Sequence, residues 1–275
     1  EFDYYKATSA AEAIQLLNAH RDAKVLAGGH SLLPLLKLRL ARPAALIDIG
    51  GIADLRGISI RDGVVQIGAL TTHWAIASSA ELQNACPLLV EVAGGIGDPQ
   101  VRNLGTIGGN VMNASPAMDT GAPLVVLAAE VVLQSVGGTR VVPVGELWTG
   151  PGRTTARSDE LCTAIQLPRP VAMSGSAYVR LEYRRAMEIA VVGAAANVAL
   201  AHDGTLTGVA VALTAVAPTI IAVTGLEGLL GRPVDAAMCA AIGELAAEQA
   251  RPISDLRGSD RYRRHCVGVM ARRAA

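Results

Sequence analysis

Two glycine-rich stretches of this sequence carry residue types that could bind an anion. "AGGHSLL" covers residues 27–33 and "GTIGGN" covers residues 105–110. Adjacent glycines let backbone N–H groups converge, because no Cβ blocks close approach or positive φ. Convergent N–H groups bind anions, and a neighbouring hydroxyl can add a donor. We therefore expect one phosphate at each stretch, held by Gly28, Gly29, His30 and Ser31 in the first and by Thr106, Gly108, Gly109 and Asn110 in the second.

Neither stretch matches the common nucleotide-binding motifs. The sequence has no G-x-G-x-x-G after a strand signal and no G-x-x-x-x-G-K-[ST], which disfavours a Rossmann or P-loop domain. The simpler alternative is that each glycine pair only forms a tight turn. Because both pairs stand beside hydroxyl or amide side chains, we favour the anion site.

Composition bounds the kind of protein that carries these stretches. A length of 275 residues suits two domains, and 51% hydrophobic residues allow a sizeable core. Lys+Arg and Asp+Glu are balanced at 24 each, so nothing favours a nucleic-acid partner. No apolar run reaches the ~20 residues of a membrane-spanning helix. The first residues lack signal-peptide character. We expect a cytoplasmic protein without a membrane span.

The cysteines are isolated along the chain. Without a C-x-x-C pair, neither a zinc site nor an iron–sulfur cluster has the usual local ligand spacing. We expect reduced thiols and no metal site at the four positions, Cys86, Cys162, Cys239 and Cys266.

The elements that must position the glycine stretches can be placed by pattern. Residues 2–50 predict a β-α-β unit whose helix is capped by Ser9. Ser115 followed by proline predicts a helix that starts there. The sequence pattern changes near residues 168–170, which suggests that a smaller α+β domain begins at about residue 171 and ends in two helices. Hairpin turns are expected at Asp62-Gly63, Gly137-Gly138 and Asp203-Gly204.

Longer segments around the glycine stretches resemble a known family. "AGGHSLLPLLKLR" and "GDPQVRNLGTIGGNVMNASPAMD" resemble the FAD-carrying medium subunit of molybdenum hydroxylases, the relatives of carbon monoxide dehydrogenase and xanthine dehydrogenase. "SAYVRLEYRRAMEIAVVGAAANV" and "DLRGSDRYRRHCVGVMARRA" are similar to the C-terminal domain of that family. The resemblance covers essentially the whole chain.

The resemblance implies a fold of the α+β class. Residues 1–170 would form a vanillyl-alcohol-oxidase-type FAD-binding domain of two α+β subdomains, about 1–53 and 54–170. Residues 171–275 would form a smaller α+β C-terminal domain. FAD would lie non-covalently in the cleft between these parts, with its diphosphate on the two glycine stretches.

The resemblance also implies the residues that bind the cofactor. Asp119 would accept hydrogen bonds from the ribose, a role open to a carboxylate. Arg180 stands where relatives have lysine and would place a cation near the flavin, with different geometry. The expected binding residues are Ala27, Gly28, Gly29, His30, Ser31, Leu32, Ile96, Gly97, Thr106, Ile107, Gly108, Gly109, Asn110, Asp119, Leu161, Cys162 and Arg180.

Several of these positions also have structural interpretations. His30 is expected to contribute mostly backbone, and His73 to be structural. Ile96 and Gly97 would lie beside the isoalloxazine and ribityl chain, while Leu161 and Cys162 would form a strand along the flavin, with Cys162 as a packing residue. Arg184 and Glu188 are expected to form a structural ion pair.

The implied function is electron transfer within a complex, with no catalytic residue of this chain touching the organic substrate. A large subunit would carry the molybdenum cofactor and a small subunit two [2Fe–2S] clusters, in a dimer of heterotrimers. The alternatives are a stand-alone FAD-dependent dehydrogenase or oxidase and a flavin-free assembly scaffold. The substrate (carbon monoxide, a purine, an N-heterocycle, an aldehyde or an aromatic acyl thioester) and the acceptor (NAD+, quinone or oxygen) stay open. The arginines of residues 251–275 form either a solvated face or a partner interface.

Overall fold

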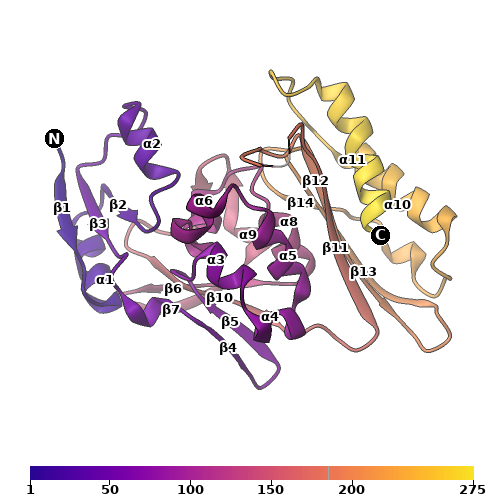
Figure 1. The fold of residues 1–275 in the computed structure, drawn as a ribbon, viewed down its shortest axis with the longest axis horizontal. Helices are drawn as coiled ribbons and strands as arrows, with labels where there is room; N and C mark the ends of the chain where they lie inside the picture. The colour runs from indigo at the N-terminus through magenta and orange to yellow at the C-terminus, as the bar shows by residue number, and fades with distance from the viewer. Residues whose placement is uncertain (185) are drawn as a thin grey trace.

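The chain folds into successive lobes that run from the N-terminus to the C-terminus (Figure 1). The computed structural model describes residues 1–184 and 186–275. Its principal sheets have three, five and four strands. The α+β class expected from the sequence is confirmed.

The first lobe is the predicted β-α-β unit. Its parallel sheet has the strand order β1-β3-β2. Ser9 caps the first helix by accepting a hydrogen bond from the Glu12 N–H at 3.1 Å. The core of this lobe is completed by Leu70 and Leu161, which belong to the next lobe in sequence. The elements are β1 (Asp3–Lys6), α1 (Ala10–Ala19), β2 (Ala23–Leu26), α2 (Leu32–Lys37), β3 (Ala45–Asp48) and the short 3-10 helix η1 (Ala53–Leu55).

The second lobe is an antiparallel sheet covered by short helices. Its strand order is β4-β5-β10-β6-β7. One hairpin turns at Asp62-Gly63 as predicted, whereas the other turns at Val136-Gly137, one residue before the predicted Gly137-Gly138, because Gly138 already pairs with Ser135. The strands are β4 (Ile58–Arg61), β5 (Val64–Gly68), β6 (Glu130–Ser135), β7 (Gly138–Pro143) and β10 (Leu161–Pro168), with a small ribbon of β8 (Trp148–Gly150) and β9 (Arg153–Thr154). The helices are α3 (His73–Ala77), α4 (Ala80–Ala85), α5 (Pro87–Gly95), α6 (Pro99–Leu104), α7 (Ile107–Asn113), α8 (Gly121–Val126) and α9 (Val144–Leu147).

The third lobe is an antiparallel sheet of order β11-β12-β13-β14 with apolar packing on both faces. Ala195 and Ala212 join the core of the second lobe, whereas Ala194 and Leu213 pack with the two last helices. Figure 1 shows those helices on the outer side of the sheet. The elements are β11 (Ser174–Leu181), β12 (Val192–Leu200), β13 (Leu206–Thr214), β14 (Ile221–Ala222), η2 (Glu227–Leu229), α10 (Ala236–Gln249) and α11 (Asp260–Ala274).

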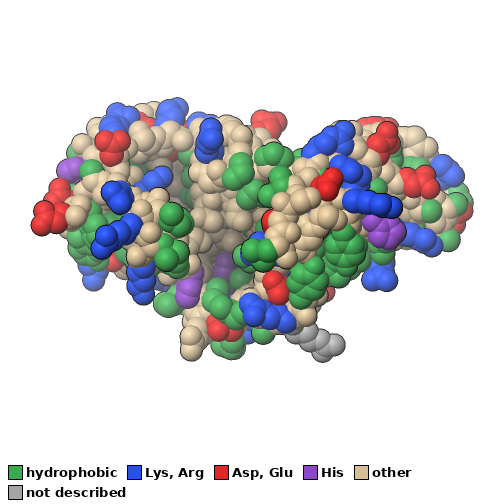
Figure 2. All heavy atoms as spheres, turned by 90° about the horizontal axis from the view of Figure 1, so that it is seen from above, with side chains coloured by type: hydrophobic (Ala, Val, Ile, Leu, Met, Phe, Trp, Pro, Cys, Tyr) green, Lys and Arg blue, Asp and Glu red, His purple; other side chains and the backbone are tan. Residues whose placement is uncertain are grey.

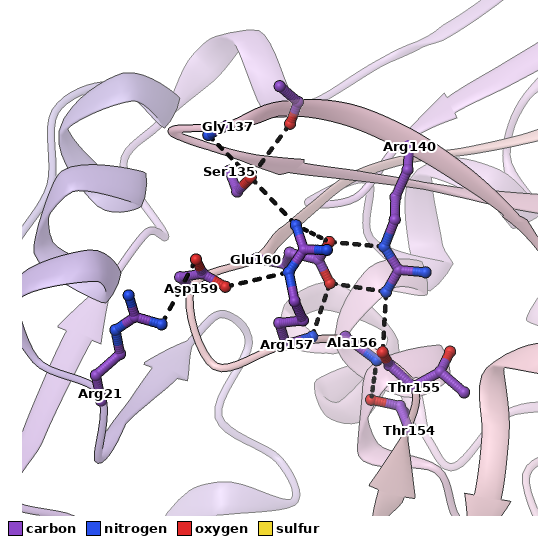
Figure 3. A network of polar contacts seen from close by, with 11 residues as sticks. Arg21, Ser135, Gly137, Arg140, Thr154, Thr155, Ala156, Arg157, Asp159 and Glu160 are labelled. Atoms are coloured by element: carbon purple, nitrogen blue, oxygen red, sulfur yellow. Dashed lines mark hydrogen bonds and ion pairs between the residues drawn. The ribbon is translucent and has the colours of Figure 1, made fainter.

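A polar network fixes the segment that leads into β10 (Figure 3). The Glu160 carboxylate is buried and accepts hydrogen bonds from Arg140 Nε at 2.7 Å and Nη2 at 2.8 Å. The backbone N–H of Arg157 donates to the same carboxylate at 2.7 Å. Asp159 pairs with Arg21 of the first lobe at 3.6 Å. The network therefore connects the first two lobes directly before Leu161.

The helix expected to start at Ser115 begins later. Residues 115–120 form turns, and α8 starts at Gly121. The carbonyl of Pro116 instead accepts hydrogen bonds from the Ala215 N–H at 2.8 Å and the Thr214 hydroxyl at 3.0 Å. If a helix began at Ser115, the Pro116 carbonyl would have to point along the helix axis. The hydrogen bonds from the end of β13 hold it in another direction.

Candidate cofactor-binding site

The two glycine stretches lie against each other, although they belong to different lobes. A Cβ on Gly28 would stand 1.9 Å from the carbonyl oxygen of Leu104, at the end of α6. A Cβ on Gly109 would stand 3.8 Å from the Cβ of Ala27. The space-filling view shows the surface hollowed between the N-terminal lobe and the middle of the molecule (Figure 2). The stretches therefore meet at a junction between lobes.

The first stretch offers a row of unused backbone donors. The N–H groups of residues 28–32 donate to no acceptor within residues 1–184 and 186–275. Gly29 has φ +76°, a left-handed conformation that glycine adopts without strain. His30 and Ser31 are exposed. Consecutive free N–H groups around a left-handed residue fit an anion such as a phosphate.

The second stretch is built differently from the expectation. It forms the first turn of α7, where the Thr106 hydroxyl oxygen accepts from the Gly109 N–H at 3.2 Å. The N–H of Ile107 donates to the Thr71 carbonyl at 3.0 Å, and that of Gly108 to the Ala69 carbonyl at 2.9 Å. These N–H groups are thus used within the protein. Free backbone N–H groups converge only in the first stretch among the two. The second stretch instead presents glycine backbone that carries no side chain.

Positions 108 and 109 of the second stretch require glycine for different structural reasons. A Cβ on Gly108 would stand 2.6 Å from the Cβ of Ala69, so this glycine is needed for packing against the protein. Gly109 is exposed, and a Cβ there would meet the Thr106 hydroxyl oxygen at 2.8 Å. Of the glycines in the two pairs, Gly29 has positive φ. The Asn110 side-chain oxygen accepts from the Thr120 hydroxyl at 2.5 Å, which fixes the amide at the same turn.

Asp119 and Arg180, expected at the cofactor from different parts of the chain, form an ion pair. Arg180 Nη1 lies 2.7 Å from Asp119 Oδ2, and the Tyr178 hydroxyl donates to Asp119 Oδ1 at 2.9 Å. Arg180 Nη2 lies 2.7 Å from the Glu182 carboxylate and donates to the Gly95 carbonyl at 3.0 Å. The guanidinium therefore joins β11 to the end of α5 and to the turn before α8.

Burial governs the electrostatics of this cluster. It raises the pKa of the Asp119 carboxyl, although the Arg180 guanidinium and the Tyr178 hydroxyl oppose the rise. Burial and the neighbouring Asp119 charge raise the pKa of Tyr178 well above its ordinary value. A cavity of about 130 Å³ adjoins the cluster, lined by Glu91, Val92, Gly95, Tyr178 and Arg180. Burial therefore outweighs the ion pair in setting the pKa of Asp119, although both carboxylate oxygens accept hydrogen bonds.

Sequence reasoning missed Tyr178 and Glu182. Both alternate with Arg180 at every second position along and just beyond β11. Successive side chains of a strand point to opposite faces, so these three share one face. The period-two pattern of polar residues was the signal that could have found them.

The remaining expected residues lie directly after α5 and at the start of β10. Gly97 has φ +53°, and its carbonyl accepts from the Met187 N–H at 3.4 Å. The Ile96 carbonyl accepts from Arg102 Nη1 at 3.0 Å. Leu161 and Cys162 are buried, and burial raises the pKa of the Cys162 thiol to about 12. A thiol held protonated in this way suits the packing role expected for Cys162.

His73 lies directly behind the second glycine stretch. It is 3% exposed, and its Nδ1 has no hydrogen-bond partner in the described part of the chain. The backbone N–H of His73 donates to the Gly105 carbonyl at 3.0 Å, and the imidazole ring would lie 3.1 Å from a Cβ on Gly105. Burial lowers the pKa of His73 to about 4, so the imidazole is neutral at pH 7. It supports the stretch from the protein side.

The predicted ion pair of Arg184 and Glu188 forms, with Arg184 Nε 3.5 Å from Glu188 Oε2. Among the described residues, no group of three or more His, Cys, Asp or Glu side chains could hold a metal ion. No helix in the same residues is long and apolar enough to cross a membrane.

Comparisons with known proteins cover the whole chain. Residues 1–170 match the FAD binding domain in molybdopterin dehydrogenase, and residues 177–275 match the CO dehydrogenase flavoprotein C-terminal domain. The carbon monoxide dehydrogenase medium chain of Hydrogenophaga pseudoflava is 39% identical over 99% of this chain and 95% of its own. The xanthine dehydrogenase FAD-binding subunit of Escherichia coli is 33% identical over 98% of this chain and 93% of its own.

A solved structure shows the same fold. Carbon monoxide dehydrogenase from Hydrogenophaga pseudoflava, which lacks the Mo-pyranopterin moiety of the molybdenum cofactor, superimposes with a TM-score of 0.96 at 38% identity. The match covers 100% of this chain and 96% of that chain.

Proposed function

Because this chain belongs to the FAD-binding medium subunits of the molybdenum hydroxylases, we propose that it binds one FAD non-covalently at the junction of its glycine stretches. The observation that carries the proposal is the row of free N–H groups at residues 28–32, which suits a diphosphate. Gly109 leaves the facing surface without a side chain. The junction therefore fits the cofactor that the family binds.

FAD, when bound, supplies a centre that accepts electrons one at a time and releases them in pairs. The chain's own residues hold and orient it. The free N–H groups of the first stretch bind negative charge, and the Arg180 guanidinium, which is paired with Asp119 and Glu182, lines the cavity at Gly95. We propose that Ile96, Gly97, Leu161 and Cys162 bound the flavin on its other sides.

The electrons come from partner chains in this proposal. A large molybdenum-cofactor subunit oxidises the substrate, and a small subunit with two [2Fe–2S] clusters relays electrons to this chain, in a dimer of heterotrimers. The absence of metal-ligand groups within the described residues leaves the clusters to those partners. We place the complex in the cytoplasm, which the four free cysteines support. Domain limits at 53/54 and 170/171 are supported by the main sheets, which lie within 3–48, 58–168 and 174–222.

A stand-alone dehydrogenase would need a base beside the flavin. Beside the proposed flavin cavity, the Asp119 and Glu182 carboxylates each lie 2.7 Å from Arg180, whereas the Glu91 carboxylate on the cavity wall forms no salt bridge with a described residue. The match over 99% of this chain to a carbon monoxide dehydrogenase medium chain favours the subunit over the stand-alone enzyme.

The purified chain itself tests the proposal. It should be yellow, and trichloroacetic acid should release all of its flavin into the supernatant. A colourless native chain would refute FAD binding, and flavin retained in the pellet would refute non-covalent attachment. The isolated chain should reduce dyes slowly with small-molecule substrates, and the complex with its partners rapidly.

A further inference from the structure

Thr120 is a buried polar residue in the turn that precedes α8. Its side chain is 1% exposed, and its hydroxyl makes no capping hydrogen bond with the helix that follows it. The hydroxyl instead donates to the side-chain oxygen of Asn110, ten positions earlier in the sequence, at 2.5 Å. A buried hydroxyl without a partner would be costly, so this contact is the one that satisfies Thr120. It joins the turn to the α7 residue that closes the second glycine stretch.

This hydrogen bond sets the direction of the Asn110 amide. An asparagine side chain ends in an oxygen that accepts hydrogen bonds and an NH2 group that donates them. Because the Thr120 hydroxyl donates to the oxygen, the NH2 group of Asn110 points away from Thr120. The NH2 group makes no hydrogen bond with a described residue, and Asn110 is only half-buried. The amide therefore presents a free donor to whatever lies on its open side.

A free side-chain donor matters here because the second glycine stretch has few backbone donors to offer. The N–H groups of residues 107–109 all donate within the protein, and the N–H of Asn110 donates to the Thr106 carbonyl at 2.9 Å. Asn110 directly follows Gly109, which faces Ala27 across the junction. An amide oxygen turned toward this junction would repel a diphosphate, whereas an NH2 group would bind it.

The position of Thr120 is itself fixed by its surroundings. The Thr214 hydroxyl donates to the Met118 carbonyl at 3.0 Å, so β13 holds the turn just before Thr120. The Thr120 carbonyl accepts from the Leu124 N–H at 2.9 Å, which ties the residue to α8. A threonine side chain is also stiff, because two heavy atoms on Cβ restrict χ1. The hydroxyl is therefore a donor held in one place.

We propose that Thr120 is a positioning residue for FAD, which turns the NH2 group of Asn110 toward the cofactor without touching the cofactor itself. The inference rests on the proposed function and adds the residue that orients a donor of the second stretch. The simpler alternative is that the Thr120 hydroxyl only stabilises the turn before α8. That alternative predicts a change in stability, whereas a positioning role predicts a change in FAD affinity that depends on Asn110.

The test is titration of the deflavinated full chain with FAD. Thr120→Val keeps the shape of the side chain and removes the donor, so the Kd for FAD should rise roughly tenfold, as expected for one weakened hydrogen bond. Thr120→Ser keeps the hydroxyl and should bind within about twofold of the wild type. Thr120→Ala differs from Thr120→Ser by the hydroxyl alone, so this second pair decides the question if valine disturbs the turn. Far-UV circular dichroism checks the fold of each variant.

A double-mutant cycle separates positioning from a merely structural role. In the Asn110→Ala background Thr120→Val should leave the Kd unchanged, because the amide that it orients is gone. Thr224→Val is the matched control, since the Thr224 hydroxyl likewise donates to a side-chain amide oxygen, that of Gln249 at 3.1 Å, in the third lobe. It should bind FAD like the wild type.

Three results would overturn the inference. They are an unchanged Kd in both Thr120→Val and Thr120→Ala, a Thr120→Ser variant as weak as Thr120→Ala, and equal weakening by Thr120→Val with and without Asn110. A wild-type chain that carries no flavin would instead refute the proposed function.

Discussion

Replacing Gly28 by alanine should abolish tight FAD binding through a contact inside the protein. The added Cβ would stand 1.9 Å from the Leu104 carbonyl oxygen, whereas ordinary contact requires roughly 3.5 Å. Neither partner is a flexible side chain, so the two backbone segments must separate by about 1.5 Å. That movement carries the free N–H groups of the first stretch away from the surface of α7.

The expected loss follows from hydrogen-bond lengths. An N–H···O bond of about 2.9 Å that lengthens by 1.5 Å is no longer a hydrogen bond. A hydrogen bond to a charged group contributes roughly 1.5–3 kcal/mol, so losing two costs about 3–6 kcal/mol. The Kd for FAD should therefore rise roughly 100- to 10,000-fold, since about 1.4 kcal/mol corresponds to a factor of ten.

Fluorescence titration of deflavinated protein with FAD measures this Kd, and circular dichroism checks the fold. Gly145→Ala is the control, because Gly145 is an exposed helical glycine with open space around its Cα. It should bind FAD like the wild type. A Gly28→Ala protein that is folded and binds FAD within twofold of the wild type would show that the junction of the two stretches does not form the site.

Further variants address the other parts of the site. Gly109→Val should lose FAD while staying folded, and Gly145→Val should retain it; equal flavin occupancy in both would mean that the second stretch is only a turn. Arg180→Gln should lower the flavin's two-electron potential in dye-equilibrated titrations, with Arg180→Lys nearer the wild type. Arg180→Gln should also destabilise the fold most at neutral pH. Its effect should be smaller in acid, because burial raises the pKa of Asp119 and the carboxyl becomes neutral there. Burial lowers the pKa of His73 to about 4, so between pH 6.5 and about 4 this imidazole is protonated only in the unfolded chain. Its contribution to wild-type stability should therefore fall by roughly 3 kcal/mol across that window. His73→Gln should show a flatter dependence of stability on pH in thermal denaturation.

Features set by neighbouring residues could be predicted from the sequence. The turn at Asp62-Gly63 needs two positive φ angles, 52° and 76°, which this pair of residue types accepts readily. The Ser9 cap acts three residues ahead on Glu12. Local chemistry decides both, so the pattern alone was sufficient.

Features set by distant residues could not be predicted in the same way. Ser115 and Pro116 have the pattern of a helix start, yet the Pro116 carbonyl is held by Thr214 and Ala215 from another lobe. The position of Gly28 in an anion-binding stretch was predicted from local glycine chemistry. Its contact with Leu104 depends on how two lobes pack, and no periodicity encodes that packing.

The core of the first lobe constrains the order of events during synthesis. Leu161 and Leu70 complete that core, so the lobe holding the first glycine stretch lacks part of its apolar interior until β10 has left the ribosome. A nascent chain that ends before Leu161 would expose Ile47 and Leu17, which are buried in the folded chain. We therefore expect flavin to bind only after β10 has been synthesised. Fragments cut between the first two lobes should depend on chaperones and remain colourless.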